Sequence, residues 1–283
     1  MAAAVSEIAR AKVNLALHVL GRRPDGYHEI DSIVAFADFG DLLTFEPADE
    51  FAIAVSGPFA ADLPPPADNI VCKAWAAVAG YAGARGLPLR PRRVHLEKNL
   101  PVAAGLGSGS ADAAATLRAL FRLEGLTPGR DECIGLALKL GADVPVCLLQ
   151  QACRMQGVGE RLLPVKLGPF AAVLVNPGIA VETAAVFREL DLDEGASHGT
   201  PVADLADTAG WRNDLMAPAI SIAPAIAGVI AALQNQKGIR LARMSGSGST
   251  CFGLFDSADI AREAARLLSA SHPQWWVRSA ALS

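Results

Sequence analysis

A glycine-rich segment without charge runs directly into an amphipathic helix pattern in "PVAAGLGSGSADAAATLRAL", residues 101–120. Gly105, Gly107 and Gly109 alternate there with Leu or Ser, so main-chain N–H groups can gather with little obstruction from side chains. A helix that begins near Ser110 adds unpaired N–H groups and the positive end of its dipole. The segment therefore favours a loop that binds an anion such as phosphate, although a tight structural turn would use the same small residues.

Two common phosphate-binding motifs do not fit this loop. A Walker A loop ends in Lys followed by Ser or Thr, and no lysine follows these glycines. The dinucleotide motif G-x-G-x-x-G has a different spacing from "GLGSGS", and no acidic residue is suitably placed after a second strand. If the loop binds phosphate, it belongs to another class of nucleotide-binding protein.

The composition is that of a globular protein with a substantial core. The 283 residues are 52% hydrophobic and 19% charged, and this length favours about two domains. A net charge of −4 predicts no nucleic-acid partner. The first residues lack the apolar core of a signal peptide, and Pro218 and Pro224 interrupt the longest apolar run. We therefore expect a cytoplasmic protein that does not bind or span a membrane.

The five cysteines are odd in number and form no C-x-x-C pair, which predicts buried free thiols in a reducing compartment. They are Cys72, Cys133, Cys147, Cys153 and Cys251.

Hydrophobic periodicity predicts a mixed order of strands and helices. Strands are expected at 12–20, at 30–47 with a break at 39–41, at 51–57, 92–102, 171–178 and 275–282, and on both sides of a glycine turn within 239–255. Helices are expected at 70–86 after a cap at Asp68 or Asn69, at 110–124, from a cap at Thr127 to about Gly141, at 212–236 with proline interruptions, and at 257–271. The polar stretch 191–210 is predicted to be a mobile connection.

Several separated motifs become informative together. They are "KVNLAL" with "RPDGYHEI" near the start, "DNIV", the glycine loop, "GADVPV" (141–146), "GVGE" and "MSGSGSTCFGLF" (244–255). In this order they resemble the GHMP kinases, over about residues 9 to 277. The resemblance implies an α+β, two-domain GHMP kinase fold. An N-terminal ATP-binding α+β domain would cover residues 1–163, and a C-terminal ferredoxin-like α/β sandwich domain would cover 164–283, with the active site between them.

The resemblance is sharpest to GHMP kinases that act on a cytidyl diphosphate ester of methylerythritol, in the non-mevalonate route to isoprenoids. It implies ATP as donor, Mg²⁺ as companion ion with no ligand assigned, the 2-hydroxyl of that small molecule as acceptor, and a monomer or weak homodimer. Two alternatives remain: a GHMP kinase for another small alcohol such as mevalonate or homoserine, and a non-catalytic nucleotide-binding relative.

The resemblance also assigns the catalytic residues. Asp143 lies in an otherwise apolar segment, where a helix-terminal Asp with local hydrogen bonds is the ordinary alternative. In the family the matching aspartate is the base that takes the proton of the attacking hydroxyl. Lys12, otherwise an edge-strand lysine, would hold Asp143 ionised and offset charge on the transferred group. Asn14, on the same strand face as Lys12, would bind substrate or pair with Lys12.

The expected ATP site follows the loop, with main-chain N–H groups and the hydroxyls of Ser108 and Ser110 as donors. Ala103, Ala104 and Ala111 depart from the commoner family pattern but leave space for phosphate. Asp112 is expected in the first helical turn, pointing away from the phosphate. Asn69 and Lys98 are candidates for the adenosine side, with a helix cap and a strand-end charge as alternatives. The full predicted set is Pro101, Val102, Ala103, Ala104, Gly105, Leu106, Gly107, Ser108, Gly109, Ser110, Ala111, Asn69 and Lys98.

A substrate pocket is predicted around the turn-rich segment 21–28. Tyr27 and His28 could simply pack the turn and face solvent, but the resemblance implies that Tyr27 stacks on cytosine and that His28 hydrogen-bonds the base. Phe187 is expected to close the opposite face of that ring, with Thr183 near the same pocket. Ser245 to Gly248, the last glycine segment, is expected to shape the active site.

Overall fold

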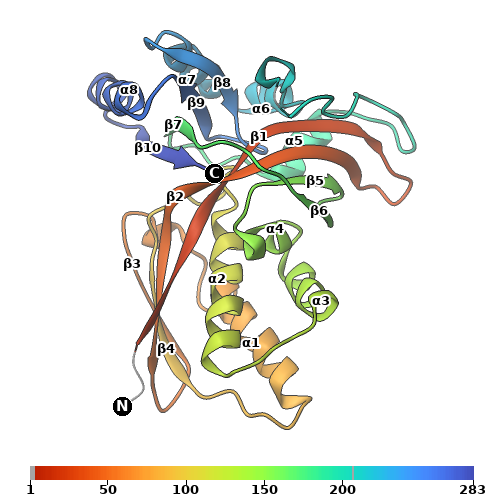
Figure 1. The fold of residues 1–283 in the computed structure, drawn as a ribbon, viewed down its shortest axis with the longest axis vertical. Helices are drawn as coiled ribbons and strands as arrows, with labels where there is room; N and C mark the ends of the chain where they lie inside the picture. Colours follow the sequence, from red (N-terminus) through yellow and green to blue (C-terminus); the bar gives the residue numbers. More distant parts are fainter. Residues whose placement is uncertain (1–3, 206) are drawn as a thin grey trace. The chain divides into compact units, whose positions relative to one another are not determined.

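The computed structural model describes residues 4–205 and 207–283, and these form two compact units that are discontinuous in sequence (Figure 1). The first unit contains the described residues up to Ala11, Phe39–Val102 and Gly107–Gln150. The second contains Lys12–Asp38, Ala103–Leu106 and Gln151–Ser283. The strands β1 (Val5–Arg22) and β2 (His28–Pro47) pair with each other and contribute residues to both units. The predicted domain boundary at 163/164 stays a prediction.

In the first unit, β3 (Ala52–Ser56) runs parallel to β4 (Arg92–Glu97), and β4 pairs antiparallel with β2 from Leu42↔Glu97 to Pro47↔Arg92. Buried and exposed side chains alternate along most of β4, as expected for a strand with one face in the core. The helices of this unit are α1 (Ile70–Gly83), α2 (Ser108–Leu123), α3 (Arg130–Leu140) and α4 (Val144–Leu149), with a short 3₁₀ turn at Ala60–Asp62.

In the second unit, β10 (Trp276–Leu282) pairs antiparallel with β7 (Phe170–Asn176), β7 with β9 (Cys251–Phe255), and β9 with β8 (Ile239–Met244). β10 also meets β2 at Leu282↔Ala37, while β5 (Cys153–Gly157) lies between β2 and β6 (Arg161–Pro164). The helices are α5 (Thr183–Glu189), α6 (Met216–Ile222), α7 (Ala225–Gln234) and α8 (Ala258–Ser271), with a 3₁₀ turn at Thr208–Gly210. The predicted α+β class is confirmed.

The predicted break at residues 39–41 is wrong, because β2 continues through Gly40. A Cβ atom at Gly40 would lie 2.0 Å from the carbonyl oxygen of Ala9. The glycine therefore permits two main chains to approach within a continuous strand.

The boundaries of the helices are partly as predicted. Asn69 caps α1, its side chain accepting a 2.9 Å hydrogen bond from the N–H of Val71. The predicted cap at Thr127 is wrong: α3 begins at Arg130, and the carboxylate of Glu132 accepts the N–H of Gly129 at 3.0 Å. α2 begins two residues before Ser110, and α4 was not predicted.

The stretch 191–210, predicted to be a mobile connection, is held along β1 by main-chain hydrogen bonds. Gly195 N–H donates to Arg22 (2.8 Å), His198 N–H to Leu20 (2.8 Å) and Gly199 N–H to Val19 (2.9 Å). The main chain of this stretch therefore lies along the edge of β1 and is hydrogen-bonded to it. The polarity of its side chains alone does not reveal this. Residue 206 lies outside the described residues.

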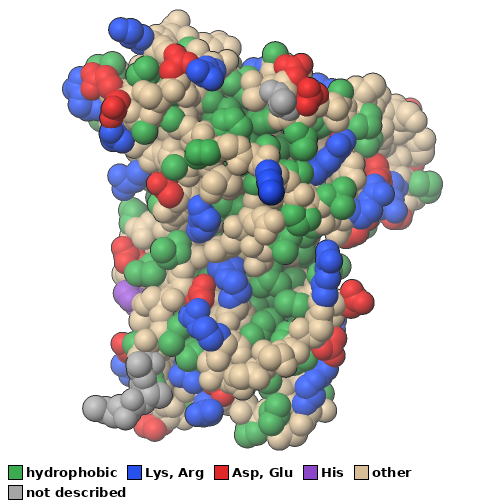
Figure 2. All heavy atoms as spheres, in the orientation of Figure 1, with side chains coloured by type: hydrophobic (Ala, Val, Ile, Leu, Met, Phe, Trp, Pro, Cys, Tyr) green, Lys and Arg blue, Asp and Glu red, His purple; other side chains and the backbone are tan. Residues whose placement is uncertain are grey.

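The cysteines are free, as predicted, but only three are buried. Cys147, Cys153 and Cys251 are buried, whereas Cys72 and Cys133 are half-buried, which corrects the expectation for these two. In the described ranges no helix has the length and apolar character needed to cross a bilayer. On the face in Figure 2, Lys and Arg side chains are interspersed with Asp and Glu rather than gathered into one basic surface.

Candidate active site

Lys12 and Asn14 form the centre of a buried polar network on β1 in the second unit. The Lys12 ammonium donates a 2.9 Å hydrogen bond to Asn14 Oδ1, and both residues are buried. Asn14 Nδ2 donates to the Ser32 hydroxyl at 2.7 Å, and that hydroxyl donates to the carbonyl of Ala16 at 2.6 Å. The period-two spacing correctly placed Lys12 and Asn14 on one face, and the network orients the ammonium group.

The two glycine-rich segments meet beside this network. The Ser245 hydroxyl donates to the Gly105 carbonyl at 2.9 Å and accepts the N–H of Asn14 at 3.1 Å. The N–H of Lys12 donates to the Leu106 carbonyl at 3.0 Å. The N–H of Thr250 donates to the Ala104 carbonyl at 3.1 Å. The structure therefore brings residues 103–106 to Lys12 and Asn14, and it gives Ser245 a supporting role.

Gly105 is required by this contact. Its φ is +74°, and a Cβ atom there would lie 2.2 Å from the Ser245 carbonyl oxygen. A side chain at this position would displace main chain rather than a flexible side chain. Gly105 is therefore explained by packing between the two glycine-rich segments, whether or not it also approaches a phosphate.

The next part of the loop opens into α2 as the sequence predicted. Gly107 adopts a left-handed conformation (φ +60°, ψ 27°) as the residue before the helix, and Ala111 N–H makes the first helical bond back to its carbonyl at 2.8 Å. The N–H groups of the first helical turn have no acceptor within the helix. A Cβ at Gly109 would meet only Ile70 Cγ2 at 3.9 Å. The start of α2 can thus receive an anion.

The two serines of the loop differ. The buried hydroxyl of Ser108 donates to the carbonyl of Pro101 at 3.0 Å, so it closes the base of the loop. Ser110 is half-buried, and its hydroxyl lies 3.9 Å from where a Cβ at Gly141 would be. Donation to phosphate by both hydroxyls stays a prediction, and Ser110 is the better placed for it because its hydroxyl is not committed to the loop's own main chain.

Asp143 immediately precedes α4 in the first unit. α3 ends before Gly141, and the carbonyl of Asp143 accepts the N–H of Cys147 at 3.2 Å as α4 begins. Pro145 occupies the first turn of α4, where its missing N–H costs nothing. Asp143 is half-buried and directly precedes the first turn of this helix.

Arg118, which the sequence analysis did not single out, holds this helix. Its guanidinium donates to the carbonyls of Cys147 at 3.0 Å and Ile8 at 3.2 Å and pairs with Glu7 at 3.3 Å. Burial lowers the pKa of Arg118, although the carboxylate of Glu7 opposes that effect. The one sequence signal for Arg118 is its position as an arginine on the helix that follows the glycine loop.

Lys98 and Asn69 have structural partners. Lys98 is buried, and its ammonium donates to Asp41 Oδ2 and to Asp112 Oδ2, each at 2.6 Å. Asn69 is buried as the cap of α1. Asp112 points to Lys98, but it lies in the second turn of α2, which corrects the expectation of the first turn. A direct contact of Lys98 or Asn69 with adenosine stays a prediction that these partners do not favour.

The predicted base pocket is only partly assembled. The rings of His28 and Phe187 are stacked with centroids 4.6 Å apart, and Tyr27 is 65% exposed. Burial and the charge of Arg22 lower the pKa of His28, whose Nε2 is buried with no hydrogen-bond partner among the described residues. The Thr183 and Ser247 hydroxyls lie 2.8 Å apart. His28, rather than Tyr27, thus faces Phe187.

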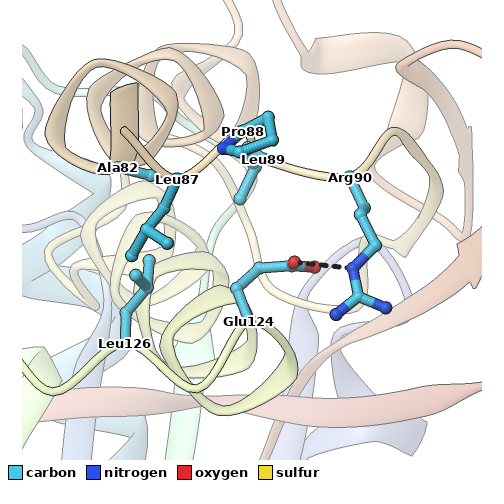
Figure 3. A pocket seen from close by; sticks show the side chains of 7 residues that line it. All are labelled: Ala82, Leu87, Pro88, Leu89, Arg90, Glu124 and Leu126. Carbon is cyan, nitrogen blue, oxygen red and sulfur yellow. Dashed lines mark hydrogen bonds and ion pairs between the residues drawn. The ribbon is translucent and has the colours of Figure 1, made fainter. Parts of the chain in front are cut away.

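A separate pocket of about 270 Å³ lies near the far end of α2, where Arg90 pairs with Glu124 at 3.2 Å (Figure 3). Since α2 has 16 residues, this pocket is roughly 24 Å from the glycine loop. No predicted site residue lines it; its lining residues are Ala82, Leu87, Pro88, Leu89, Arg90, Glu124 and Leu126.

The chain matches two protein-family models, one mostly within the first unit and one within the second. The GHMP kinases N terminal domain matches residues 69–151, and the GHMP kinases C terminal domain matches residues 202–273. The fold is similar to a crystal structure of homoserine kinase from Cytophaga hutchinsonii, with a TM-score of 0.66 at 19% identity over 99% of this chain and 95% of that one. With these two matches, the chain is a GHMP kinase, and its fold agrees with that class.

Similar proteins narrow this class. A 4-diphosphocytidyl-2-C-methyl-D-erythritol kinase of Parvibaculum lavamentivorans is 48% identical over 99% of both chains, and one of Cereibacter sphaeroides is 50% identical over 96% of this chain and 97% of its own. A crystal structure of 4-(cytidine 5'-diphospho)-2C-methyl-D-erythritol kinase has a TM-score of 0.81 at 36% identity, covering 99% of each chain. The chain belongs to the family of 4-diphosphocytidyl-2-C-methyl-D-erythritol kinases.

Proposed function

We propose that this protein transfers the γ-phosphoryl group of ATP to the 2-hydroxyl of 4-diphosphocytidyl-2-C-methyl-D-erythritol, a step toward isoprenoid precursors. The observation that carries the proposal is the buried Lys12 ammonium, held by Asn14 on a strand whose main chain binds the glycine loop. A cation fixed beside a phosphate loop suits phosphoryl transfer, in which positioning and charge stabilisation supply most of the catalysis.

ATP would bind with its phosphates at the loop and the start of α2. The left-handed Gly107 and the open space beside Gly109 support this, since main-chain N–H groups can approach phosphate there without side chains. The positive end of the α2 dipole favours the same anion. Ser110 would add a hydroxyl donor.

Asp143 would act as the base that accepts the proton of the attacking hydroxyl. A carboxylate in a phosphoryl-transfer site needs alignment more than high basicity. Lys12 would counter the charge that develops on the transferred group, because an ammonium already in place does not have to reorganise during the reaction.

Mg²⁺ would accompany ATP. Among the described residues no group of three or more His, Cys, Asp and Glu side chains could hold a metal ion, so the protein offers no closed cage there. Mg²⁺ does not need such a group, because it keeps several waters and is commonly bound through substrate phosphates with one or two carboxylates. The ion would neutralise phosphate charge.

The cytidine end of the acceptor would lie at Tyr27, His28 and Phe187. The stacked His28 and Phe187 rings, the Nε2 of His28 with no partner among the described residues and the exposed ring of Tyr27 support an aromatic pocket that can stack on a base and hydrogen-bond its edge. Thr183 would border this pocket.

We also propose a cytoplasmic enzyme that acts as a monomer or weak homodimer.

Phosphate transfer from ATP should be compared across the cytidyl substrate, mevalonate and homoserine. We expect turnover with the cytidyl substrate alone. Preference for mevalonate or homoserine would assign a different small-alcohol kinase, and ATP binding without transfer to any acceptor would indicate a non-catalytic relative.

A further inference from the structure

The base of the glycine loop is closed by a buried cluster of charges in the first unit, which we call the loop clamp: Asp41, Lys98 and Asp112. Lys98 comes just after β4 and three residues before the loop, whereas Asp112 comes from α2 just after it. The Lys98 ammonium joins the two carboxylates, with both N–O distances 2.6 Å. All three side chains are at most 1% exposed.

Asp41 also binds the chain that leads into the loop. Its Oδ1 accepts the N–H of Asn99 at 2.6 Å and the N–H of Leu100 at 2.8 Å. The hydroxyl of Ser108 then ties the start of α2 to the carbonyl of Pro101 at 3.0 Å. Both ends of the loop are therefore fixed by buried side chains.

We propose that Asp41, Lys98 and Asp112 are positioning residues for phosphoryl transfer, which hold the two ends of the ATP loop at a fixed separation, with a proton on Asp112. This inference rests on the proposed ATP site. It assigns Lys98 to the support of the loop rather than to contact with adenosine.

The proton follows from the charge and hydrogen-bond balance of the clamp. Two ionised carboxylates and one ammonium would leave a net negative charge in the interior, which is costly without further partners. Asp41 has partners on both oxygens, while Asp112 Oδ1 is buried with no partner among the described residues. Burial raises the pKa of Asp112 to about 8; Lys98 opposes this shift, and Asp41 adds to it. A proton on Asp112 makes the clamp neutral.

The first test is hydrogen exchange, which does not depend on activity. In Lys98→Met we expect the amides of Asn99 and Leu100 to exchange about 10-fold faster or more, since their acceptor loses its cationic partner. The amide of Val71, bound by Asn69 in the same unit, serves as an internal reference that keeps its protection. Lys139→Met, at an exposed position on α3, is the matched control and should leave all three unchanged.

The second test uses Asp112→Asn, which keeps an acceptor for Lys98 but cannot ionise. In the natural protein the KM for ATP should rise several-fold between pH 7 and pH 9. Over this range Asp112 loses its proton, and the loop clamp gains a net negative charge that disfavours phosphate in the loop. In Asp112→Asn the ratio of the two KM values should be about one. The same variant should remove a loss of thermal stability between about pH 4 and pH 8, where the folded chain holds a proton that the unfolded chain releases.

The outcomes are separable. Altered ADP affinity in Lys98→Met with unchanged protection of Asn99 and Leu100 would overturn the clamp and favour direct contact of Lys98 with the nucleotide. An unchanged pH ratio in Asp112→Asn would overturn the protonated state. If Lys98→Met fails to fold, the test rests on Asp112→Asn, through its KM ratio and the pH dependence of its thermal stability. If the natural protein transfers no phosphate, the proposed function fails, whereas the exchange measurement still decides on the clamp.

Discussion

The Lys12 ammonium and the Asn14 side-chain oxygen are joined by a buried hydrogen bond of 2.9 Å, two residues apart on β1. Asn14 is in turn held through its amide nitrogen by Ser32 and through its main-chain N–H by Ser245. Asn14, which orients the lysine ammonium, is therefore itself held by two serines, one at its side chain and one at its main chain.

Asn14→Ala should lower kcat about 100-fold, because Lys12 loses the group that orients it and a displacement of about 1 Å can cost that much. Measured kcat with ATP and the cytidyl substrate checks this, and the melting temperature separates it from unfolding. Ser32→Ala is the control: it keeps the Lys12–Asn14 bond and should cost far less. Equal losses in the two variants would mean that the network acts only through stability.

Asp143→Asn should keep ADP affinity but lose most turnover. Removal of an aligned general base typically costs about 10²–10⁴-fold, whereas the amide has nearly the same shape. Single-turnover rates and ADP titration check both parts. Asp131→Asn, at an exposed position in the first turn of α3, is the control. A near-normal rate for Asp143→Asn would show that another group takes the proton.

The glycines of the ATP loop should respond differently to substitution. Gly107→Val should weaken ATP more than the cytidyl substrate, because valine is strained at φ +60° and intrudes on the loop. Gly109→Ala has room in the first turn of α2 and should raise stability by up to about 1 kcal/mol, yet also weaken ATP binding.

Thermal melting without ligand and ATP titration measure these two effects. Gly135→Ala is the control that should raise stability without any change in ATP affinity, because Gly135 lies within α3 and a Cβ atom there would meet open space. Normal ATP affinity in both Gly107→Val and Gly109→Ala would leave the loop as a structural turn.

Tyr27→Ala and Phe187→Ala should each raise the KM for the cytidyl substrate about 10-fold or more, because stacking on one aromatic ring contributes roughly 1–3 kcal/mol. Steady-state kinetics with each substrate varied in turn checks this, and the KM for ATP should stay near normal. Reduced ATP affinity instead would move these residues to the donor side.

His28→Ala extends that prediction to specificity. The ratio of kcat/KM for the cytidyl form to that for the uridyl form of the substrate should fall. The hydrogen bond from His28 would match the edge of cytosine but not the edge of uracil, so its loss removes a basis for choosing between them. Burial lowers the pKa of His28, so it should read the base as neutral imidazole at pH 7. An unchanged ratio would leave His28 as a packing partner of Phe187.

Several local features are predicted correctly because the responsible atoms are near in the chain, although the cap at Thr127 is a local error. The Asn69 cap of α1 and the loop that opens into α2 depend on residues within one or two turns. The same holds for Lys12 and Asn14, whose contact follows from strand periodicity.

Other errors arise where the partner is distant in sequence. The sequence predicts a break at Gly40 because nothing nearby shows that Ala9 lies against it. It leaves Lys98 as a candidate for adenosine because the partner Asp41 lies 57 residues earlier. It expects Ser245 only to shape the site, and the bond from Ser245 to Gly105 spans 140 residues. Periodicity carries no information on such pairs.

The order of strands in the second unit has a consequence for synthesis on the ribosome. β10 pairs along the whole of β7 and meets β2 at Leu282↔Ala37, while the main chains of Phe36 and Ser283 exchange two hydrogen bonds of 2.9 and 3.0 Å. Residues 36 and 37 of β2 and the whole of β7 are translated earlier, yet their sheet neighbour β10 begins only at residue 276. The nascent strands must therefore remain unpaired on that edge, and protected from other chains, until residues 276–283 have left the exit tunnel.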